Sequence, residues 1–381
     1  MTVVQIKYPY FSILLPTKNR AHLVDFAIRS VLMQSFQDYE LIIADNDDSE
    51  STKAIVKKFH DERIRYIRTG GLSMVENWNV ALDAVSGIHV IVLEDKMIFY
   101  PGALESIKTK IKESKSGVVV WNYDVIDDES VSAKLIKKKK KADEVVKTKD
   151  ILERIISNVM GCYTLLPRGL CCSVPSSTIK EIKKISNRRF YEELSPDFVS
   201  AIKILNFVDE YTILGSIFNL VTSSRVSNGK KVRLRQHADH SYFLGRSKIR
   251  PHTEFFFLES DLILANLVIS DYLMQRRIQR GKLVDYNVTN RHYFEMLFRE
   301  FSEVTLESRK IIWSKNEVFD LFLKGDGVIL NLLYSIIMFW TFAKKRFFIS
   351  PPGSNAARYK IIHLTSKEEY IEDILNSHEF Q

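Results

Sequence analysis

Residues 11–20 read FSILLPTKNR and residues 39–48 read YELIIADNDD. Each stretch is a short apolar run that ends in polar residues, the first at Pro16 and the second at Asp45. Apolar runs of this length predict buried β-strands. Between them, apolar residues recur at helical spacing over residues 23–34, which predicts a helix. The opening of the chain is therefore a strand, a helix and a strand.

The same alternation continues. Helical patterns cover residues 51–59 and 74–85, an extended segment covers 64–67, and apolar strands cover 89–93 and 118–121. Strands separated by helices predict an α/β fold with a mainly parallel sheet that is covered on both faces. In such sheets ligands bind beyond the carboxyl ends of the strands.

The length, composition and charge of the chain limit the number of domains and the kinds of partner that we expect. The chain has 381 residues, 45% of them hydrophobic, and this length predicts two or three domain-sized units. The 55 basic and 47 acidic residues leave a net charge of +8, which favours a partner that carries phosphates or an anionic membrane surface. Nucleic acid is the competing partner, but zinc-finger spacing, RNA-binding aromatic motifs and a helix-turn-helix pattern are all lacking. We therefore expect no nucleic-acid function.

The cysteines and the apolar segments indicate in which cellular compartment the protein acts. Cys162, Cys171 and Cys172 are odd in number and lack paired zinc spacing, so we expect reduced thiols in a cytoplasmic protein. No basic stretch leads into an apolar region at the N-terminus, which argues against a secretory signal. The apolar stretch at residues 328–343 is shorter than the roughly 20 residues of a spanning helix.

The remaining chain is less regular. Residues 122–149 are polar and charged and include five lysines at 137–141, so we expect a solvated loop there. The alternative is contact with anionic lipid or a phosphorylated carrier. Residues 150–228 return to mixed helix and strand, and the pattern beyond residue 251 is nearly all helical.

The two opening strands end in side chains that suit a nucleotide. Asp45 and the polar residues after it would lie beside residues 16–20, because neighbouring parallel strands end at the same edge. This edge would offer a carboxylate for base or ribose hydrogen bonds and cations for phosphate. The plainer alternative is a turn whose Asp and Ser side chains bond their own backbone.

Several ordered motifs resemble the opening of family 2 glycosyltransferases. They are residues 12–20, 30–36, 40–45, 77–79 and 94–95, with Ala81, Leu82 and Gly87 between the last two. The resemblance covers about the first 110 residues. A weaker similarity to the acceptor half of polysaccharide-synthesis members recurs at residues 195–197, 215–216 and 227–229.

The resemblance implies a GT-A nucleotide-sugar-binding fold. We expect a glycosyltransferase domain over residues 1–240, with a donor half at about 1–121 and an acceptor half at about 150–240. A helical C-terminal region would follow over residues 241–381.

The resemblance also implies donor-binding residues. Thr17 and Asn19 would lie near the nucleotide, and Asp45 would bind its base. The full set that we expect at the donor is Pro16, Thr17, Asn19, Arg20, Asp45, Glu94, Asp95, Lys96 and Arg225.

The acidic motif departs from the family pattern. Glu94 and Asp95 match its first two positions, but Lys96 stands where another carboxylate is usual. One expectation is that Asp95 alone ligates a divalent cation, Mn²⁺ or Mg²⁺, on the donor diphosphate. The other is that Lys96 partly replaces the ion as a fixed positive charge. The sequence leaves both open.

Inverting transfer needs a base for the acceptor hydroxyl. The local candidates are Glu192, Glu193 and Asp197, and we favour Asp197 because it lies in the motif that resembles the family. Its alternative role is that of an acidic residue in the first turn of a helix.

Basic and aromatic residues later in the chain suggest two further contacts. Arg225 begins a basic stretch, with Lys230, Lys231, Arg233 and Arg235, that could close over the donor diphosphate. His237 and His240 follow and are expected to be surface residues rather than metal ligands. Residues 332–348, apolar and then basic, fit either a membrane interface or a buried helix.

These observations predict a glycosyltransferase of surface polysaccharide synthesis at the inner face of the membrane. It would transfer a sugar, with inversion, from a nucleotide sugar to a saccharide or lipid-linked acceptor, and the resemblance implies that the donor is a UDP-sugar. A nucleotidyltransferase is disfavoured because residues 16–20 contain no glycine. A degenerate sugar-binding or membrane-assembly scaffold is the non-enzymatic alternative, and Lys96 is its main support.

Overall fold

The computed structural model describes part of the chain. The described ranges are residues 8–130, 132–186, 189–192, 195–227, 264–279, 281–289, 291–293, 295–297, 299–300 and 359–377.

Within these ranges eleven strands form one sheet. They are β1 (Phe11–Thr17), β2 (Tyr39–Asp45), β3 (Ile64–Arg68), β4 (His89–Val92), β5 (Met97–Phe99), β6 (Val119–Asp127), β7 (Lys134–Lys138), β8 (Glu144–Lys147), β9 (Cys172–Pro175), β10 (Glu210–Val221) and β11 (Tyr359–His363).

The first four strands are parallel neighbours in the order β4-β1-β2-β3, as the sequence predicts. The register pairs Thr17 with Asp45 and Asp45 with Arg68, so these residues end three adjacent strands side by side. Beyond β4 the sheet is mixed: β9 runs antiparallel to β4 and to β6, while β10 is parallel to β6.

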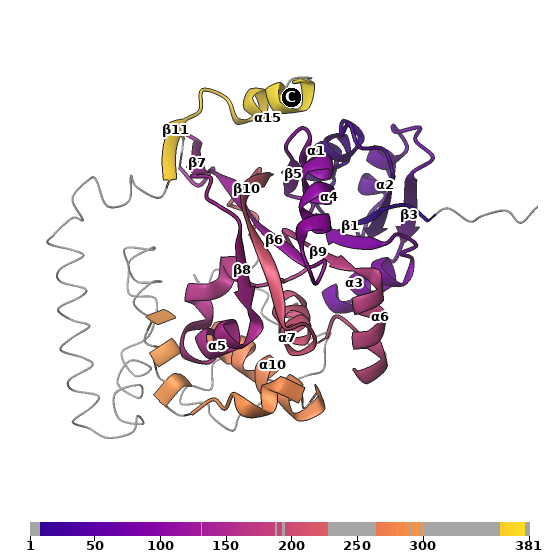
Figure 1. Ribbon diagram of the computed structural model, residues 1–381. Helices are drawn as coiled ribbons and strands as arrows, with labels where there is room; N and C mark the ends of the chain where they lie inside the picture. Colours follow the sequence, from indigo (N-terminus) through magenta and orange to yellow (C-terminus); the bar gives the residue numbers. More distant parts are fainter. Residues whose placement is uncertain are drawn as a thin grey trace, which may run out of the picture.

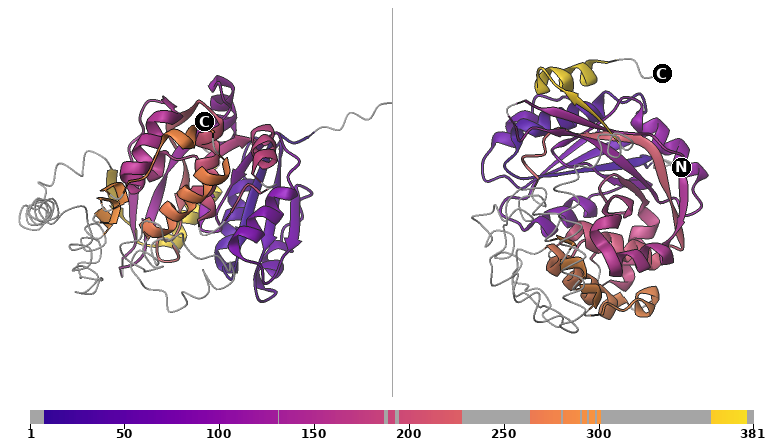
Figure 2. Two further views of the ribbon diagram at one scale, coloured as in Figure 1. Left: turned by 90° about the horizontal axis from the view of Figure 1, so that it is seen from below. Right: turned by 90° about the vertical axis from the view of Figure 1, so that its left-hand side faces the viewer.

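Helices cover both faces of the sheet (Figures 1 and 2). They are α1 (Ala21–Leu32), α2 (Ser51–Val56), α3 (Met74–Asp83), α4 (Ala103–Glu113), α5 (Thr148–Cys162), α6 (Ser176–Ile185), α7 (Pro196–Phe207), α10 (Leu264–Gln279) and α15 (Lys367–Asn376), with short 3₁₀ turns η1 (Tyr163–Leu165) and η2 (Gly281–Asp285).

Alternation along β1 divides the core into two layers. Ile13 and Leu15 pack with buried residues of α1, α2 and α4, whereas Leu14 packs with those of α3, α6 and α7. Successive side chains of a strand point to opposite faces, so a strand with both faces covered is apolar throughout. This accounts for the unbroken apolar runs in the sequence.

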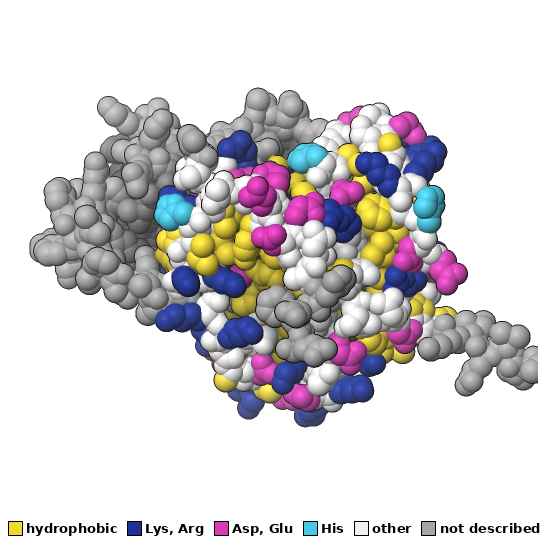
Figure 3. Space-filling view, turned by 90° about the horizontal axis from the view of Figure 1, so that it is seen from above, with side chains coloured by type: hydrophobic (Ala, Val, Ile, Leu, Met, Phe, Trp, Pro, Cys, Tyr) yellow, Lys and Arg dark blue, Asp and Glu magenta, His cyan; other side chains and the backbone are white. Residues whose placement is uncertain are grey.

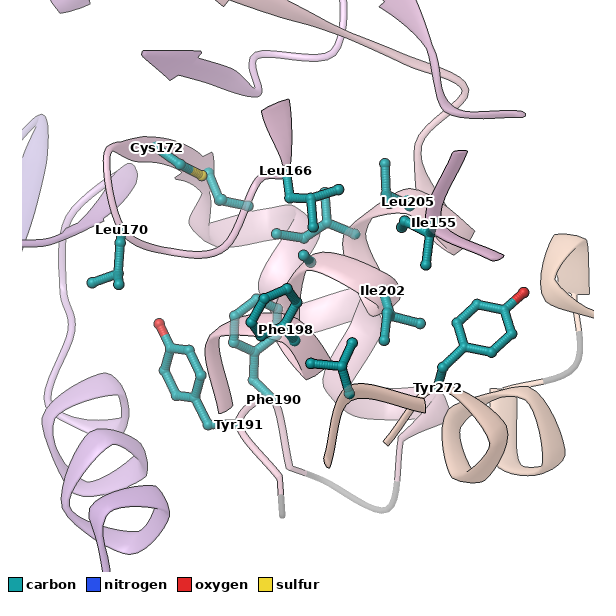
Figure 4. Close-up of a cluster of buried hydrophobic side chains, with 14 of the residues drawn as sticks. Ile155, Leu166, Leu170, Cys172, Phe190, Tyr191, Phe198, Ile202, Leu205 and Tyr272 are labelled. Atoms are coloured by element: carbon teal, nitrogen blue, oxygen red, sulfur yellow. The ribbon is translucent and has the colours of Figure 1, made fainter. Parts of the chain in front are cut away.

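A second group of buried side chains fixes the position of α7 (Figure 4). Phe198 and Ile202 of α7 lie among Phe190, Tyr191 and Tyr272, and all five are buried. The ring of Tyr191 also meets that of Trp78 on α3 edge to face, at 5.1 Å between centroids. Packing therefore links the amino end of α7 to the parallel part of the sheet.

The solvated loop expected at residues 122–149 is wrong, because β6, β7 and β8 occupy most of this segment. Strand β7 lies between β6 and β11, and its Leu135 is fully buried while Lys137 is exposed. Hydrogen-bonded neighbours on both sides hold this lysine-rich segment as a strand, so its composition alone gave the wrong prediction.

The end of the chain returns to the sheet. Strand β11 pairs antiparallel with β7, and α15 packs against α1 (Figures 1 and 2). The described part of the C-terminal region is thus not all helical.

Several predicted features lie outside the described residues: Glu193, Lys230, Lys231, Arg233, Arg235, His237, His240 and residues 328–348. Among the helices that the structure does describe, none has the length and apolar character needed to cross a membrane.

Candidate active site

The carboxyl ends of β2 and β3 hold a buried carboxylate. Asp45 has no exposed surface and accepts hydrogen bonds from the Tyr66 hydroxyl at 2.5 Å and from Arg68 Nη1 at 2.8 Å. The backbone N–H of Asp47 donates a third at 2.9 Å. These bonds compensate the cost of burying the charge and fix the orientation of the carboxylate. Hydrogen bonding to Asp45 and desolvation together raise the pKa of Tyr66 to about 12, with desolvation the larger cause.

The loop after β1 is tied to the loop after β2. Asn19 has a φ of 55°, in the left-handed region that asparagine tolerates better than most residues. Its backbone N–H donates to Asp47, its side-chain amide donates to Asp48 at 2.8 Å, and the Asp48 N–H donates back at 3.0 Å. Asn19 therefore holds two site loops together.

The loop after β4 brings a second carboxylate to the same edge. Asp95 is nearly buried and accepts hydrogen bonds from Thr17 Oγ1 at 3.0 Å and from Arg20 Nη1 at 3.1 Å. Thr17 is also the register partner of Asp45. The ends of β1, β2 and β4 thus meet around Thr17.

Glu94 and Asp95 do not by themselves fit a metal ion. Glu94 forms an ion pair with Lys96 at 3.1 Å, and Asp95 forms one with Arg20 at 3.1 Å. Both carboxylates already face cations of the chain. Within the described ranges no group of three His, Cys, Asp or Glu side chains is placed to hold a metal. An ion here would have to compete with Arg20 or Lys96.

Asp197 lies in the first turn of α7, directly after Pro196. Arg168 Nη1 donates to its carboxylate at 2.8 Å, while the Arg168 Nε donates to the Tyr163 carbonyl at 3.1 Å. Arg168 is 4% exposed and Asp197 is 22% exposed, so the carboxylate alone has access to solvent.

Burial raises the pKa of Asp197 above its ordinary value, although the Arg168 guanidinium opposes the rise. The negative charge of Glu94, in the loop after β4, adds to the rise. A carboxyl group with a raised pKa is a stronger base when it is ionised.

The remaining predicted residues have other contacts. Pro16 is buried within β1 and presents no group to a ligand. Arg225 is bonded through its guanidinium to the carbonyl of Asp128 at 2.6 Å. Glu192, the alternative base, is buried against Lys203 at 3.0 Å and Gln275 at 2.7 Å, which are structural contacts.

Sequence reasoning missed three residues of the site: Tyr66, Arg68 and Arg168. Arg68 could have been found, because it ends the strand next to Asp45. Arg168 follows no strand and belongs to no motif, so only the folded structure places it beside Asp197.

Charge is not segregated on the described part of the face seen in Figure 3, where acidic and basic side chains are interspersed around hydrophobic areas. The net charge of +8 is not gathered there in one basic area.

Comparison with known proteins finds similarity over the part of the chain that includes the ends of β1, β2 and β4. The model described as Glycosyl transferase family 2 matches residues 12–171, which include the ends of β1, β2 and β4. The chain is 34% identical over 114 residues to the GalNAc(5)-diNAcBac-PP-undecaprenol beta-1,3-glucosyltransferase of Campylobacter jejuni, covering 29% of this chain and 37% of that one.

It is 28% identical over 126 residues to the UDP-Glc:alpha-D-GlcNAc-diphosphoundecaprenol beta-1,3-glucosyltransferase WfgD of Escherichia coli, covering 33% of this chain and 50% of the relative. The chain thus spans half or less of the length of these relatives. Among solved structures, S. aureus TarS 1-349 in complex with UDP-GlcNAc has a TM-score of 0.46 at 16% identity, over 77% of this chain and 80% of that one.

Proposed function

We propose that this chain transfers a sugar from a nucleotide sugar to a lipid-linked saccharide, because the model described as Glycosyl transferase family 2 matches residues 12–171. The observation that carries the proposal is the junction at Thr17, where the strand end that bears Asp45 meets the loop that bears Glu94 and Asp95. Both named relatives are beta-1,3-glucosyltransferases that act on undecaprenol-linked glycans, which supports a role in surface polysaccharide synthesis.

In this proposal the donor is a UDP-sugar, as in the printed name of the Escherichia coli relative. Asp45 accepts a hydrogen bond from the base after Tyr66 or Arg68, which cover its buried carboxylate, gives up its own bond to it. Arg20 lies in the loop after β1 and Lys96 in the loop after β4. Both supply positive charge to the diphosphate, which carries the developing negative charge in the transition state. Arg20 is 20% exposed and Lys96 11%, so both retain access to a ligand.

Transfer would then proceed by direct displacement. The acceptor oxygen forms a bond to the anomeric carbon while the bond from that carbon to the diphosphate oxygen breaks. The electron pair of the broken bond leaves with the nucleoside diphosphate. Asp197 takes the proton of the acceptor hydroxyl, and Arg168 keeps its carboxylate in place. The product has inverted configuration.

The lipid-linked acceptor implies a place of action at the inner face of the cell membrane, with peripheral contact. The undecaprenol in the names of both relatives supports this part of the proposal.

The test is transfer of radiolabelled glucose from UDP-glucose to an undecaprenyl-diphosphate-linked saccharide. We expect labelled lipid with the wild-type protein and about 10²-fold or greater loss of kcat with Asp197→Asn, because a positioned general base contributes about this much. Asp209→Asn is the matched control, since that carboxylate is 92% exposed and pairs with Lys282 outside the site.

Asp197→Asn should still bind UDP. Normal turnover by this variant would reject Asp197 as the base. UDP binding without any transfer over a panel of nucleotide sugars and acceptors would favour the non-catalytic scaffold.

A further inference from the structure

Residues 359–377, here called the C-terminal clip, dock on the donor half of the fold. The clip consists of β11, which pairs with β7, and α15. Ile371, Ile374 and Leu375 of α15 are buried in one cluster with residues of β5, β6, β7 and β10. The clip therefore contributes to a buried hydrophobic cluster of the fold.

Two ion pairs attach α15, one at its amino end and one near its middle. Glu372 receives a two-pronged contact from Arg29 of α1, at 2.6 and 2.8 Å. Lys367, at the amino end, donates to Asp128 at 3.1 Å. Lys367 and Asp128 are largely buried, with 23% and 13% of their side chains exposed.

Asp128 in turn organises the segment after β10. Its carboxylate accepts hydrogen bonds from the Ser223 hydroxyl at 2.7 Å and from the Arg225 N–H at 3.1 Å. Burial raises the pKa of Asp128, but the bonds from Ser223, Arg225 and Lys367 together outweigh it and leave the pKa lowered. The carboxylate is therefore an anion at neutral pH.

Residues 222–226 then contact the guanidinium of Arg20 and the backbone of Lys96. The Val226 carbonyl accepts a hydrogen bond from Arg20 Nη2 at 2.8 Å, while Nη1 of the same guanidinium holds Asp95. The N–H and hydroxyl of Thr222 donate to the Lys96 carbonyl at 2.8 and 2.9 Å. The orientation of Arg20 thus depends on a backbone segment that Asp128 fixes.

We propose that Lys367 is a positioning residue of the donor site, which acts through Asp128 and residues 222–226 to hold Arg20 against Asp95. Its Nζ contacts no residue that the proposed reaction uses, so its effect is indirect. The part that concerns the donor rests on the function proposed above. The contact network itself does not depend on that function.

The test compares two substitutions in the same helix. Lys367→Met removes the charge that faces Asp128 and keeps a chain of similar length. Glu372→Gln removes the charge of the other ion pair, which has no link to residues 222–226. Lys367→Arg preserves the charge and is the rescue variant. Thermal unfolding of each protein measures any general loss of stability.

Two readouts decide the proposal. Hydrogen exchange of the Arg225 amide should quicken in Lys367→Met and remain as in wild type in Glu372→Gln and Lys367→Arg. Calorimetric binding of UDP should weaken about three- to tenfold in Lys367→Met only, the scale of coupling carried by contacts remote from a ligand.

Unchanged exchange and affinity in Lys367→Met would overturn the proposal, as would equal effects in Lys367→Met and Glu372→Gln, because the clip would then act only through stability. If wild-type protein binds no UDP, the proposed function fails. The exchange of Arg225 still decides whether Lys367 positions this segment.

Discussion

At the scale of single residues, the proposed base Asp197 and its partner Arg168 predict how activity depends on pH. Burial raises the pKa of Asp197 and Arg168 lowers it. A base works in its ionised form, so kcat/KM should rise with pH, with a midpoint above the ordinary range of aspartate.

Replacing Arg168 with Gln should move the midpoint to higher pH, because the opposing positive charge is lost. The measurement is the pH profile of kcat/KM beside that of Arg154→Gln, an exposed arginine on α5. A folded Arg168→Gln protein with an unmoved midpoint would contradict the role of Asp197.

Lys96 and Arg20 bear on metal dependence. Since both carboxylates of the acidic motif already face these cations, we expect transfer to persist in excess EDTA. Lys96→Ala should lower kcat by about 10²-fold, the usual cost of removing one group that stabilises charge in the transition state. Complete loss of wild-type transfer in EDTA, restored by Mn²⁺, would show instead that a cation displaces these contacts.

His89 predicts how stability depends on pH. Burial lowers its pKa to about 4 from 6.5, so the folded protein binds the proton more weakly than the unfolded chain. The stabilisation of the neutral ring is complete above about pH 6.5 and is lost as the pH falls toward 4. This amounts to about 2 to 3 kcal/mol.

The free energy of unfolding of wild type and His89→Gln, measured by urea at pH 7 and pH 4.5, checks this. The decrease in the free energy of unfolding from pH 7 to pH 4.5 should be smaller in His89→Gln than in wild type. An equal loss in both proteins would mean that other groups account for it.

At the scale of elements, α15 tests whether the clip is part of the core. Ile371 is fully buried, and Ile371→Ala should cost about 2 to 5 kcal/mol of unfolding free energy through lost packing and a cavity. Ile361→Ala on β11 is the control, because that side chain is 52% exposed and should cost less than about 1 kcal/mol. Equal losses of unfolding free energy in Ile371→Ala and Ile361→Ala would contradict the packing of α15 in the core.

The strands differ in how well the sequence predicts them. β1, β2 and β4 are buried on both faces, so each is a plain apolar run that local reasoning identifies. β7 has only Leu135 fully buried, and its lysines resemble a loop until β6 and β11 supply hydrogen-bond partners. Its identity as a strand is decided by segments distant in the chain.

At the scale of the molecule, the contacts that the sequence predicts are those between segments with a periodic pattern, and contacts between distant residues without such a pattern are missed. The parallel register makes the ends of β1 and β2 coincide, so the junction of Thr17 and Asp45 could be anticipated from two apolar runs. The contact between Lys367 and Asp128 joins residues 239 apart, and no periodic pattern signals it. The pairing of Arg168 with Asp197 was equally hidden, since one of its members lies in no motif.

The central claim is that the strand-end junction around Asp45 binds a uridine nucleotide, and calorimetric titration of UDP tests it most directly. Asp45→Asn should weaken UDP binding about ten- to a hundredfold, because a charged acceptor is lost. The matched control is Asp61→Asn, which breaks a similar pair with Arg63 at the opposite end of β3 and should bind UDP as wild type does. Equal affinity in wild type and folded Asp45→Asn, or no UDP binding by the wild-type protein, would contradict the account.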